Sequence, residues 1–200
     1  MSKFILMPTS GGMIYIYDST KRRYKCIFQK ALKSSVKKEI VKQIKLAAHK
    51  YNLWPTHSYG KVIEDRQTQI TFSALGQKAP TEVKKQWKKQ NFRKKSMMKR
   101  MLALNLKKMN VKLGGSTSID VTQQNIDKAF GVKKLIEIFL KKYHKKLGFK
   151  NLLFFGDNFT KHGNDYPIKA IGVPSIRVET YQQTLLYLDA IKKWALDNLQ

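Results

Sequence analysis

The amino-acid sequence predicts an α/β fold in which a parallel-sheet core is interrupted by an α+β insertion. Two observations support this fold class. The last third of the chain alternates strand-like and helix-like segments, and residues 151–155 (NLLFF) are apolar almost throughout, as in parallel strands covered on both faces. The middle of the chain instead combines hairpin signals with amphipathic helices, which is the pattern of an α+β unit.

The N-terminal segment is expected to form strands. Residues 4–8 (FILMP) and 12–17 (GMIYIY) predict two short strands around a Gly-Gly turn, and residues 24–29 predict a third. The glycines and the proline that interrupt this apolar stretch favour folded core over a signal peptide.

The first predicted helix covers residues 34–51. Its apolar side chains recur at helical spacing, with lysines on the opposite side. They are Val36, Ile40, Ile44, Ala47 and Tyr51. Ser34 or Ser35 is the expected N-cap.

The middle of the chain predicts two hairpins and a long helix. Residues 61–73 alternate as two strands joined by a tight turn at residues 66–67. A helix is expected after Pro80, within residues 81–109, with a core-facing stripe. The stripe consists of Met97, Met101 and Leu104. The pair Gly114-Gly115, between NVKL and STSIDV, suits the positive φ angles of a primed hairpin turn.

The C-terminal third predicts alternating helices and strands. In chain order they are a helix over residues 125–146, a buried strand over 151–155, a short helix over 165–170, a strand over 175–178 and a final amphipathic helix. The apolar face of this last helix is expected to contain Leu185, Leu188, Ile191 and Trp194.

Composition excludes some classes of protein and leaves others open. The formal net charge is +27, from 40 basic and 13 acidic side chains. Such an excess attracts polyanions, but the lysines are spread over most predicted helices, which also fits exposed positions that have drifted to lysine. No apolar run is long enough to span a membrane, and the single Cys26 excludes a disulfide framework within the chain and favours the cytoplasm.

Two aspartates follow the predicted buried strand. Asp157 stands directly after it, at the sheet edge where α/β folds place ligands, and Asp165 opens the next helix. Two carboxylates that converge on one loop suit a hard cation such as Mg²⁺. The alternative is that Asp157 caps a turn and Asp165 caps a helix, and the spacing alone does not separate these two interpretations.

The segment GDNFTKHGND, residues 156–165, resembles the fourth motif of the haloacid-dehalogenase (HAD) superfamily, GDxxxxxGND. The resemblance implies that Asp157 and Asp165 hold Mg²⁺, although His162 stands where a glycine is usual. Residues 118–135 resemble the third motif, in which Lys128 would neutralise the phosphoryl group.

Two further segments extend the resemblance over nearly the whole chain. PTSGGMIY resembles the second motif, with Thr9 as the hydroxyl that hydrogen-bonds the phosphate. IEDRQTQITFSALGQKAP and GGSTSIDV resemble the type IIB cap of the phosphomannomutase branch and its bacterial sugar-phosphatase-like relatives.

In that branch, cap arginines bind the distal phosphate of a sugar phosphate. Arg66 matches the first of them, whereas the other two fall at Gln77 and Lys84. The positive charge is lost at Gln77, and at Lys84 an ammonium replaces the bidentate guanidinium. Ser118 and Asp120 match residues that contact the substrate. The resemblance implies one phosphate-and-magnesium pocket beneath a mobile cap.

The resemblance also implies the domain organisation. Residues 1–20 and 121–200 would form an HAD-like, Rossmann-like core, and residues 21–120 the α+β cap. HAD catalysis begins with a DxDx(T/V) motif whose first aspartate attacks phosphorus, yet no Asp-x-Asp occurs in these 200 residues. The core is therefore expected to be N-terminally truncated: either the sequence is a fragment, or the gene product has lost its first strand and helix.

A core without its nucleophile strand should expose a sheet edge and apolar surface. We expect poor solubility, a homodimer, or a partner chain that covers the edge.

Three functions remain open. The first is a Mg²⁺-dependent sugar-phosphate phosphatase or phosphomannomutase-like protein that is inactive as this chain, and the departures at Gln77 and Lys84 support phosphatase at least as well as mutase. The second is a non-catalytic protein that still binds phosphorylated ligands. The third is a basic nucleic-acid-binding protein that uses residues 84–112, with binding driven by charge and not by sequence.

Overall fold

A computed structural model describes residues 4–161 and 163–198 of the chain. The chain divides into two compact units, an N-terminal unit, Met1–Ile126, and a C-terminal unit, Asp127–Gln200. Strands and helices occur in both, which confirms the predicted α/β class. The predicted pairing of residues 1–20 with 121–200 in one domain stays a prediction.

The N-terminal unit contains two antiparallel sheets. Its strands are β1 (Ile5–Leu6), β2 (Met13–Asp18), β3 (Arg23–Gln29), β4 (Ile63–Asp65), β5 (Gln69–Ser73), β6 (Met109–Leu113) and β7 (Ser118–Gln123). One sheet has the order β1-β2-β3 and the other the order β4-β5-β7-β6. The strands predicted in this part of the chain are therefore confirmed.

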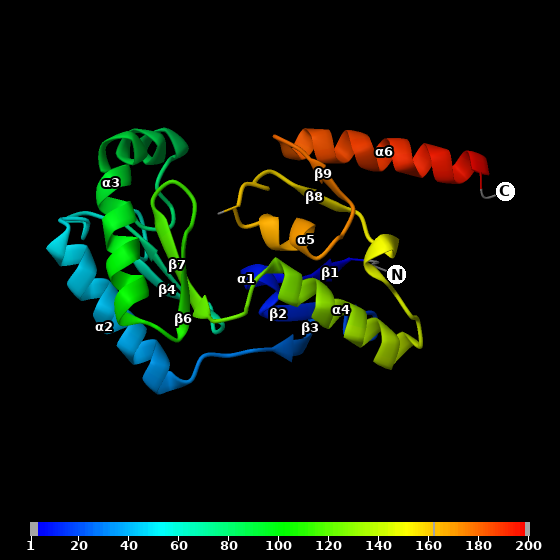
Figure 1. Cartoon of the computed structure of the whole chain (residues 1–200), viewed down its shortest axis with the longest axis horizontal. Helices are drawn as coiled ribbons and strands as arrows, with labels where there is room; N and C mark the ends of the chain where they lie inside the picture. Colours follow the sequence, from blue (N-terminus) through cyan, green and yellow to red (C-terminus); the bar gives the residue numbers. More distant parts are fainter. Residues whose placement is uncertain (1–3, 162, 199–200) are drawn as a thin grey trace. The chain divides into compact units, whose positions relative to one another are not determined.

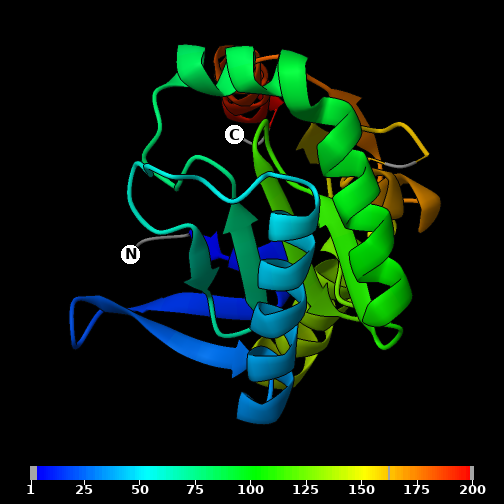
Figure 2. The same ribbon diagram turned by 90° about the vertical axis from the view of Figure 1, so that its left-hand side faces the viewer.

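Two helices, α2 (Ser34–Lys50) and α3 (Thr81–Asn105), pack on one face of the four-stranded sheet (Figures 1 and 2). Because side chains alternate along a strand, every second residue of β5 and β7 points to these helices. Phe72 and Ile119 do so, and they are fully buried with Ile44 and Met98 from the helices. The other face of the sheet is therefore left to polar side chains.

Two details of these helices differ from the predictions. The N-cap of α2 is Lys33, without a side-chain cap bond, so the cap predicted at Ser34 or Ser35 is wrong. The core-facing row of α3 contains Met98 and Leu102, whereas Met97 and Leu104 are exposed. Of the predicted stripe, Met101 is half-buried and packs against the core, so the prediction is confirmed there and wrong at Met97 and Leu104. A lysine, Lys95, occupies another of the inward positions.

The connection between β6 and β7 is not the predicted primed turn. Neither Gly114 nor Gly115 has a positive φ, and four residues separate the strands. The Nζ of Lys95 donates hydrogen bonds to the carbonyl oxygens of Gly115 and Ser116, at 2.9 and 3.0 Å. A buried side chain, which the local sequence does not reveal, thus holds this loop.

The C-terminal unit contains one short parallel sheet and its helices. The elements are α4 (Lys128–Tyr143), the 3₁₀ turn η1 (Phe149–Asn151), β8 (Phe154–Gly156), α5 (Tyr166–Ala170), β9 (Ser175–Arg177) and α6 (Tyr181–Asn198). β8 pairs with β9 in parallel. The strand predicted over residues 151–155 is thus shorter, and Phe154 and Phe155 are half-buried, so the prediction of a strand covered on both faces is wrong.

The final helix, α6, buries none of its residues. Leu185, Leu188 and Trp194 on the predicted apolar face are 53, 48 and 63% exposed. Its packing on the sheet includes Tyr187, whose ring centroid lies 5.8 Å from that of Phe155. The predicted exposed apolar surface is therefore present on α6.

Candidate active site

The loop that follows β8 is organised around one carboxylate. Asp165 is fully buried, and its Oδ2 accepts hydrogen bonds from the backbone N–H groups of Asp157 and Asn158, both at 3.0 Å. Its Oδ1 accepts a charged hydrogen bond from Nζ of Lys128. The structure therefore brings the side chains of Lys128 and Asp165 and the backbone of Asp157 together at the carboxyl end of β8.

Local sequence explains this arrangement. The side chain of Asp127 caps α4 by accepting from the N–H of Phe130 at 2.9 Å, so Lys128 stands at the first residue of that helix. A Cβ on Gly156 would lie 2.6 Å from Oδ2 of Asp165, and a Cβ on Gly163 would lie 2.1 Å from the carbonyl oxygen of Asn158. Only glycine fits at these two positions, because no real Cβ approaches so closely.

The environment of Asp165 favours its ionised form. Burial is the largest single influence and by itself would raise the pKa of this carboxyl. The hydrogen bonds from Lys128 and from the N–H groups of Asn158 and Asp157, with the charge of Lys128, outweigh burial and lower the pKa below its ordinary value. The lysine also lies over the ring of Phe154, with Nζ 5.4 Å from the ring centroid.

The two aspartates differ in what they can bind. Asp165 occupies the N-cap position of α5 but makes no side-chain cap bond, so the alternative that it caps this helix is wrong. Both of its oxygens are engaged. Asp157 is exposed, and its carboxylate makes no hydrogen bond or ion pair within residues 4–161 and 163–198, so it is the carboxylate free to hold a cation.

The donor set fits Mg²⁺ only as part of a larger coordination shell. Among the described residues, no group of three or more His, Cys, Asp or Glu side chains could enclose a metal ion. Mg²⁺ is commonly bound through one or two carboxylates, with water and phosphate oxygens completing the shell. The exposed carboxylate of Asp157 meets this smaller requirement.

The cap positions named by the resemblance also meet in space. Arg66 donates from Nε and Nη2 to Oε2 of Glu64, at 2.8 and 2.7 Å, and from Nη2 to Oε1 of Gln77 at 3.5 Å. The Nζ of Lys84 donates to the carbonyl oxygen of Gln77 at 3.2 Å. Arg66 and Lys84 therefore both contact Gln77. The Nε2 atom of Gln77 is buried without a hydrogen-bond partner in the described part of the chain.

Ser118 and Asp120 lie on the sheet face opposite the helices. Oδ1 of Asp120 accepts from the hydroxyl of Thr71 at 2.8 Å, and that hydroxyl in turn accepts from Nε2 of Gln69 at 2.8 Å. Burial raises the pKa of Asp120 above its ordinary value, against the opposing effects of the Thr71 hydroxyl and the charge of Arg66. This face is polar and largely shielded from water.

Thr9 lies in the short helical turn α1 (Pro8–Gly11) with a φ of 52°, which is unusual for a β-branched residue. Its hydroxyl donates to the carbonyl oxygen of Pro8 at 2.8 Å and hydrogen-bonds the hydroxyl of Thr68 at 2.6 Å. Either of these two hydroxyl groups can be the donor in the bond between them. Its predicted role as a phosphate donor stays a prediction.

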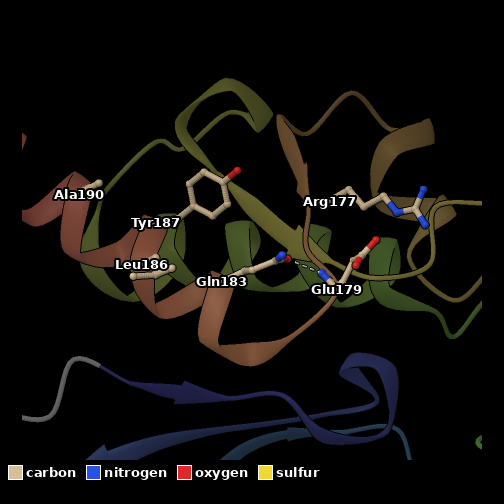
Figure 3. Close-up of a pocket in the computed structure, with 6 residues that line it drawn as sticks. All are labelled: Arg177, Glu179, Gln183, Leu186, Tyr187 and Ala190. Atoms are coloured by element: carbon tan, nitrogen blue, oxygen red, sulfur yellow. Dashed lines mark hydrogen bonds between the residues drawn. The ribbon is translucent and has the colours of Figure 1, made fainter.

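Arg177 was not among the predicted site residues, yet it lies close to them in the sheet. In the parallel sheet its partner is Gly156, so Arg177 and Asp157 stand at the same sheet edge. Arg177 lines a hollow of about 560 Å³ in the C-terminal unit, together with residues that follow β9 and residues of α6 (Figure 3). They are Glu179, Gln183, Leu186, Tyr187 and Ala190. The position of Arg177 at the end of a predicted strand was the available signal.

The chain belongs to the HAD superfamily by its fold and by its sequence family. The fold matches that of Plasmodium falciparum IMP-nucleotidase in an N-terminally truncated, IMP-bound form, with a TM-score of 0.59, 16% identity and 95% of this chain covered. A second structure of the N-terminally truncated Plasmodium falciparum protein gives a TM-score of 0.56 at 17% identity over 94% of this chain.

The family follows from sequence. The family model described as eukaryotic phosphomannomutase matches residues 3–190, and the chain belongs to this family. A phosphomannomutase of Encephalitozoon cuniculi is 29% identical over 147 residues, which are 70% of this chain and 54% of the relative. The chain thus spans about half the length of this relative, as it does of the two nucleotidase structures, at 48 and 49%.

Proposed function

We propose that this protein takes part in HAD-type phosphoryl transfer on a phosphorylated sugar or a similar small phosphate ester. The observation that carries the proposal is the Lys128–Asp165 pair beside the free carboxylate of Asp157, at the carboxyl edge of parallel strands. α/β folds bind ligands at this edge.

The three side chains would have different roles. Asp165, fixed by Lys128 and two N–H groups, holds the loop and orients the lysine. The Lys128 ammonium, about one-third exposed, neutralises negative charge on phosphate oxygens. Asp157 would hold Mg²⁺ with Asp165 as its neighbour, and the bound ion would supply further charge neutralisation.

The substrate end of the site is proposed from the cap positions. Arg66 and Lys84, which converge on Gln77, would bind a phosphate, and Ser118 and Asp120 would hydrogen-bond hydroxyl groups. Thr9 would contribute a hydroxyl to the transferred phosphate. The relative from Encephalitozoon cuniculi is named a phosphomannomutase, and the Plasmodium structures contain IMP or ATP, all consistent with phosphate esters as ligands. With Gln77 and Lys84 at positions where the resemblance implies arginines, a distal phosphate would be bound less tightly. This supports a phosphatase activity as well as a mutase activity.

We further propose that this chain alone does not turn over substrate and that an Asp-x-Asp segment must be supplied to it. The 200 residues contain no such pair, and apolar side chains of α6 are exposed. A homodimer or a partner chain that covers the exposed edge of the β8–β9 sheet would serve the same purpose. Within the described residues no helix is long and apolar enough to cross a membrane. The lone Cys26 is compatible with the cytoplasm.

The test separates binding from turnover. Phosphate release from mannose 1-phosphate, mannose 6-phosphate and glucose 6-phosphate should be absent with the 200-residue chain and Mg²⁺, and robust release would contradict the need for a supplied segment. Binding of inorganic phosphate with Mg²⁺, measured by calorimetry, should be lost in Lys128→Met and weakened in Asp157→Asn.

The matched control is Lys133→Met, which removes an exposed lysine from the same helix and should bind as the unmodified protein does. Equal binding by all four proteins, or none by the unmodified protein, would contradict the proposed site.

Charge-driven nucleic-acid binding is the second candidate. The exposed surface of α3 is rich in cations, and Glu82 is the one acidic residue in the helix. Affinity for a single-stranded oligonucleotide should fall steeply and without sequence preference as salt rises. Sequence-selective binding that survives moderate salt would support a specific nucleic-acid function.

A further inference from the structure

Lys95 is a buried charged side chain that has no part in the function proposed above. It lies on the inward-facing row of α3 with Met98 and Leu102, and 2% of its surface is exposed. Among the described residues it has no carboxylate partner within ion-pair distance. An isolated buried ammonium is costly, and an apolar residue would fill this position without that cost. The hydrogen bonds that the ammonium makes are therefore the feature to explain.

The ammonium of Lys95 holds the loop of residues 114–117 between β6 and β7. Its Nζ donates to the carbonyl oxygens of Gly115 and Ser116, at 2.9 and 3.0 Å. The next carbonyl oxygen, that of Thr117, accepts from the backbone N–H of Ala74 at 3.1 Å. Hydrogen bonds from a charged donor are roughly twice as strong as those between neutral groups. Lys95 is therefore a stronger restraint on this loop than the backbone contact with Ala74.

The loop of residues 114–117 lies against two of the proposed ligand-binding side chains. The N–H of Gly114 donates to the carbonyl oxygen of Ser118 at 2.9 Å. A Cβ on Gly114 would lie 3.0 Å from Oδ2 of Asp120 and 3.0 Å from Cβ of Ser118. Since Ser118 and Asp120 are proposed to hydrogen-bond ligand hydroxyl groups, a displaced loop would displace or block the atoms that meet the ligand.

We propose that Lys95 is a positioning residue for the ligand: its ammonium fixes the loop of residues 114–117, and this loop fixes the side chains of Ser118 and Asp120. This role rests on the proposed function, because Ser118 and Asp120 belong to the substrate end of that site. Lys95 is too deeply buried to contact a ligand itself, so it acts through the loop. Side chains that meet a ligand need supporting residues of this kind, since a small error in their position costs affinity.

The proton of Lys95 makes this positioning dependent on pH. Burial, with the charge of Lys88 on the same helix, lowers the pKa of Lys95 from 10.5 to about 8, and the charge of Asp120 on β7 opposes the shift. The loop itself, GGST, has no charged side chain. A neutral amine makes weaker hydrogen bonds than an ammonium. The loop is therefore held fully below about pH 8 and less firmly as pH rises through that value.

The first test compares two ligands by calorimetry in the presence of Mg²⁺. Mannose 1-phosphate has sugar hydroxyl groups that Ser118 and Asp120 would meet, whereas inorganic phosphate has no sugar. Lys95→Met should weaken the binding of mannose 1-phosphate by about tenfold and that of inorganic phosphate by no more than about twofold. Lys94→Met, at the exposed neighbouring position, is the matched control and should change neither affinity.

The second test is the pH profile of binding, which a purely structural role would not change. The affinity of the unmodified chain for mannose 1-phosphate should fall by about threefold or more from about pH 7 to about pH 9.5. The Lys95→Met variant should bind with nearly constant affinity over this range. Leu102→Ala removes a fully buried side chain from the same row of α3 and should lower stability. Wherever circular dichroism shows it folded, it should keep the affinity and the pH profile of the unmodified chain.

Three results would overturn the positioning role. They are equal affinities of Lys95→Met and the unmodified chain for mannose 1-phosphate, the same pH profile in both proteins, and equal losses of affinity in Lys95→Met and Leu102→Ala. The profile of the unmodified chain needs no variant, so a flat profile would be decisive even where Lys95→Met fails to fold. Failure of the unmodified chain to bind either ligand would overturn the proposed function together with this role, whereas loss of the positioning role alone would leave that binding intact.

Discussion

The two units of this protein are held together in different ways. Among the described residues, 19 buried hydrophobic side chains lie in the N-terminal unit and four in the C-terminal unit. The four are Ala129, Ile168, Val173 and Val178. The N-terminal unit closes two helices over a four-stranded sheet, whereas the C-terminal unit has a two-stranded sheet and a final helix without a buried residue.

The larger apolar core and the proposed Mg²⁺ and phosphate site therefore lie in different units. The residues of the proposed Mg²⁺ and phosphate site, Lys128, Asp157 and Asp165, lie in the unit with the smaller apolar core. Their arrangement depends on hydrogen bonds to one buried carboxylate and on two close glycine contacts. Polar contacts of this kind specify a geometry well but add less free energy than a large core.

The largest expected effect lies in the N-terminal core. Phe72 is fully buried and stacks near Trp54, with ring centroids 6.4 Å apart, so Phe72→Ala should lower the free energy of unfolding by about 3–5 kcal/mol. Leu186→Ala in α6, where the side chain is 69% exposed, should change it by less than about 0.5 kcal/mol. Denaturant unfolding of both variants would measure the contrast, and similar losses would show that α6 is buried in solution.

The next largest change in the free energy of unfolding is expected for the buried carboxylate of Asp165. Asp165→Asn should cost about 1–3 kcal/mol, because Lys128 loses its charged partner but is about one-third exposed. Asp157→Asn is the matched control and should be nearly neutral for stability, since this carboxylate is exposed.

The same pair has a defined pH dependence. The pKa of Asp165 is lower in the folded chain than the value of 3.8 for a free side chain, so its contribution is present above about pH 4 and is lost as pH falls through the folded-state pKa. The stability difference between the unmodified protein and Asp165→Asn should therefore shrink below pH 4. A difference that is constant with pH would contradict the ion pair.

A smaller effect belongs to Lys95, which is 2% exposed. Burial, with a further contribution from Lys88, lowers its pKa from 10.5 to about 8, although Asp120 opposes the shift. Between these two values the unfolded chain binds more protons than the folded chain, so stability rises with pH. Relative to Lys95→Met, the unmodified protein should therefore gain stability from pH 8 to pH 10.5.

At pH 7 the Lys95→Met variant should lie within about 2 kcal/mol of the unmodified protein, because two hydrogen bonds are lost while a buried charge is removed. Lys94→Met, at an exposed neighbouring position, is the control and should show no such pH dependence. Parallel unfolding curves for both variants across this pH range would contradict the prediction.

The smallest effect is expected at the surface. Glu82 and Lys85 form an exposed ion pair at 2.9 Å in the first turn of α3, and Glu82→Ala should change the free energy of unfolding by less than about 0.5 kcal/mol. A larger change, measured by thermal unfolding at low and moderate salt, would show that surface charge contributes to the stability of the N-terminal unit.

Periodicity was sufficient to predict most of the secondary structure. The row of Ile40, Ile44 and Ala47 predicted α2, and the alternation around Ile70 and Phe72 predicted β5, because each pattern directly reflects one buried face. The register of α3 failed because a lysine is expected at the surface, while Lys95 is buried by hydrogen bonds to a loop distant in sequence. Such contacts between residues distant in sequence cannot be predicted from the spacing of apolar residues within one helix.

The candidate site could be predicted only in part from local sequence. The spacing of Asp157 and Asp165 could not distinguish a cation site from two caps. Only the resemblance of residues 118–135 to a family motif singled out Lys128 among 40 basic residues. Arg177 was missed because its place beside Gly156 depends on strand pairing, which the sequence of either strand alone does not specify.

Within the described residues, Nε2 of Gln77 has no hydrogen-bond partner, which has a consequence for any ligand that reaches this side chain. A buried N–H without an acceptor raises the free energy of the empty protein by about 1–3 kcal/mol. An incoming sugar hydroxyl or phosphate oxygen that accepts this hydrogen would relieve that penalty and bind more tightly by a corresponding amount. Gln77 carries no charge, so this unmet hydrogen bond is what its side chain can offer to such a ligand.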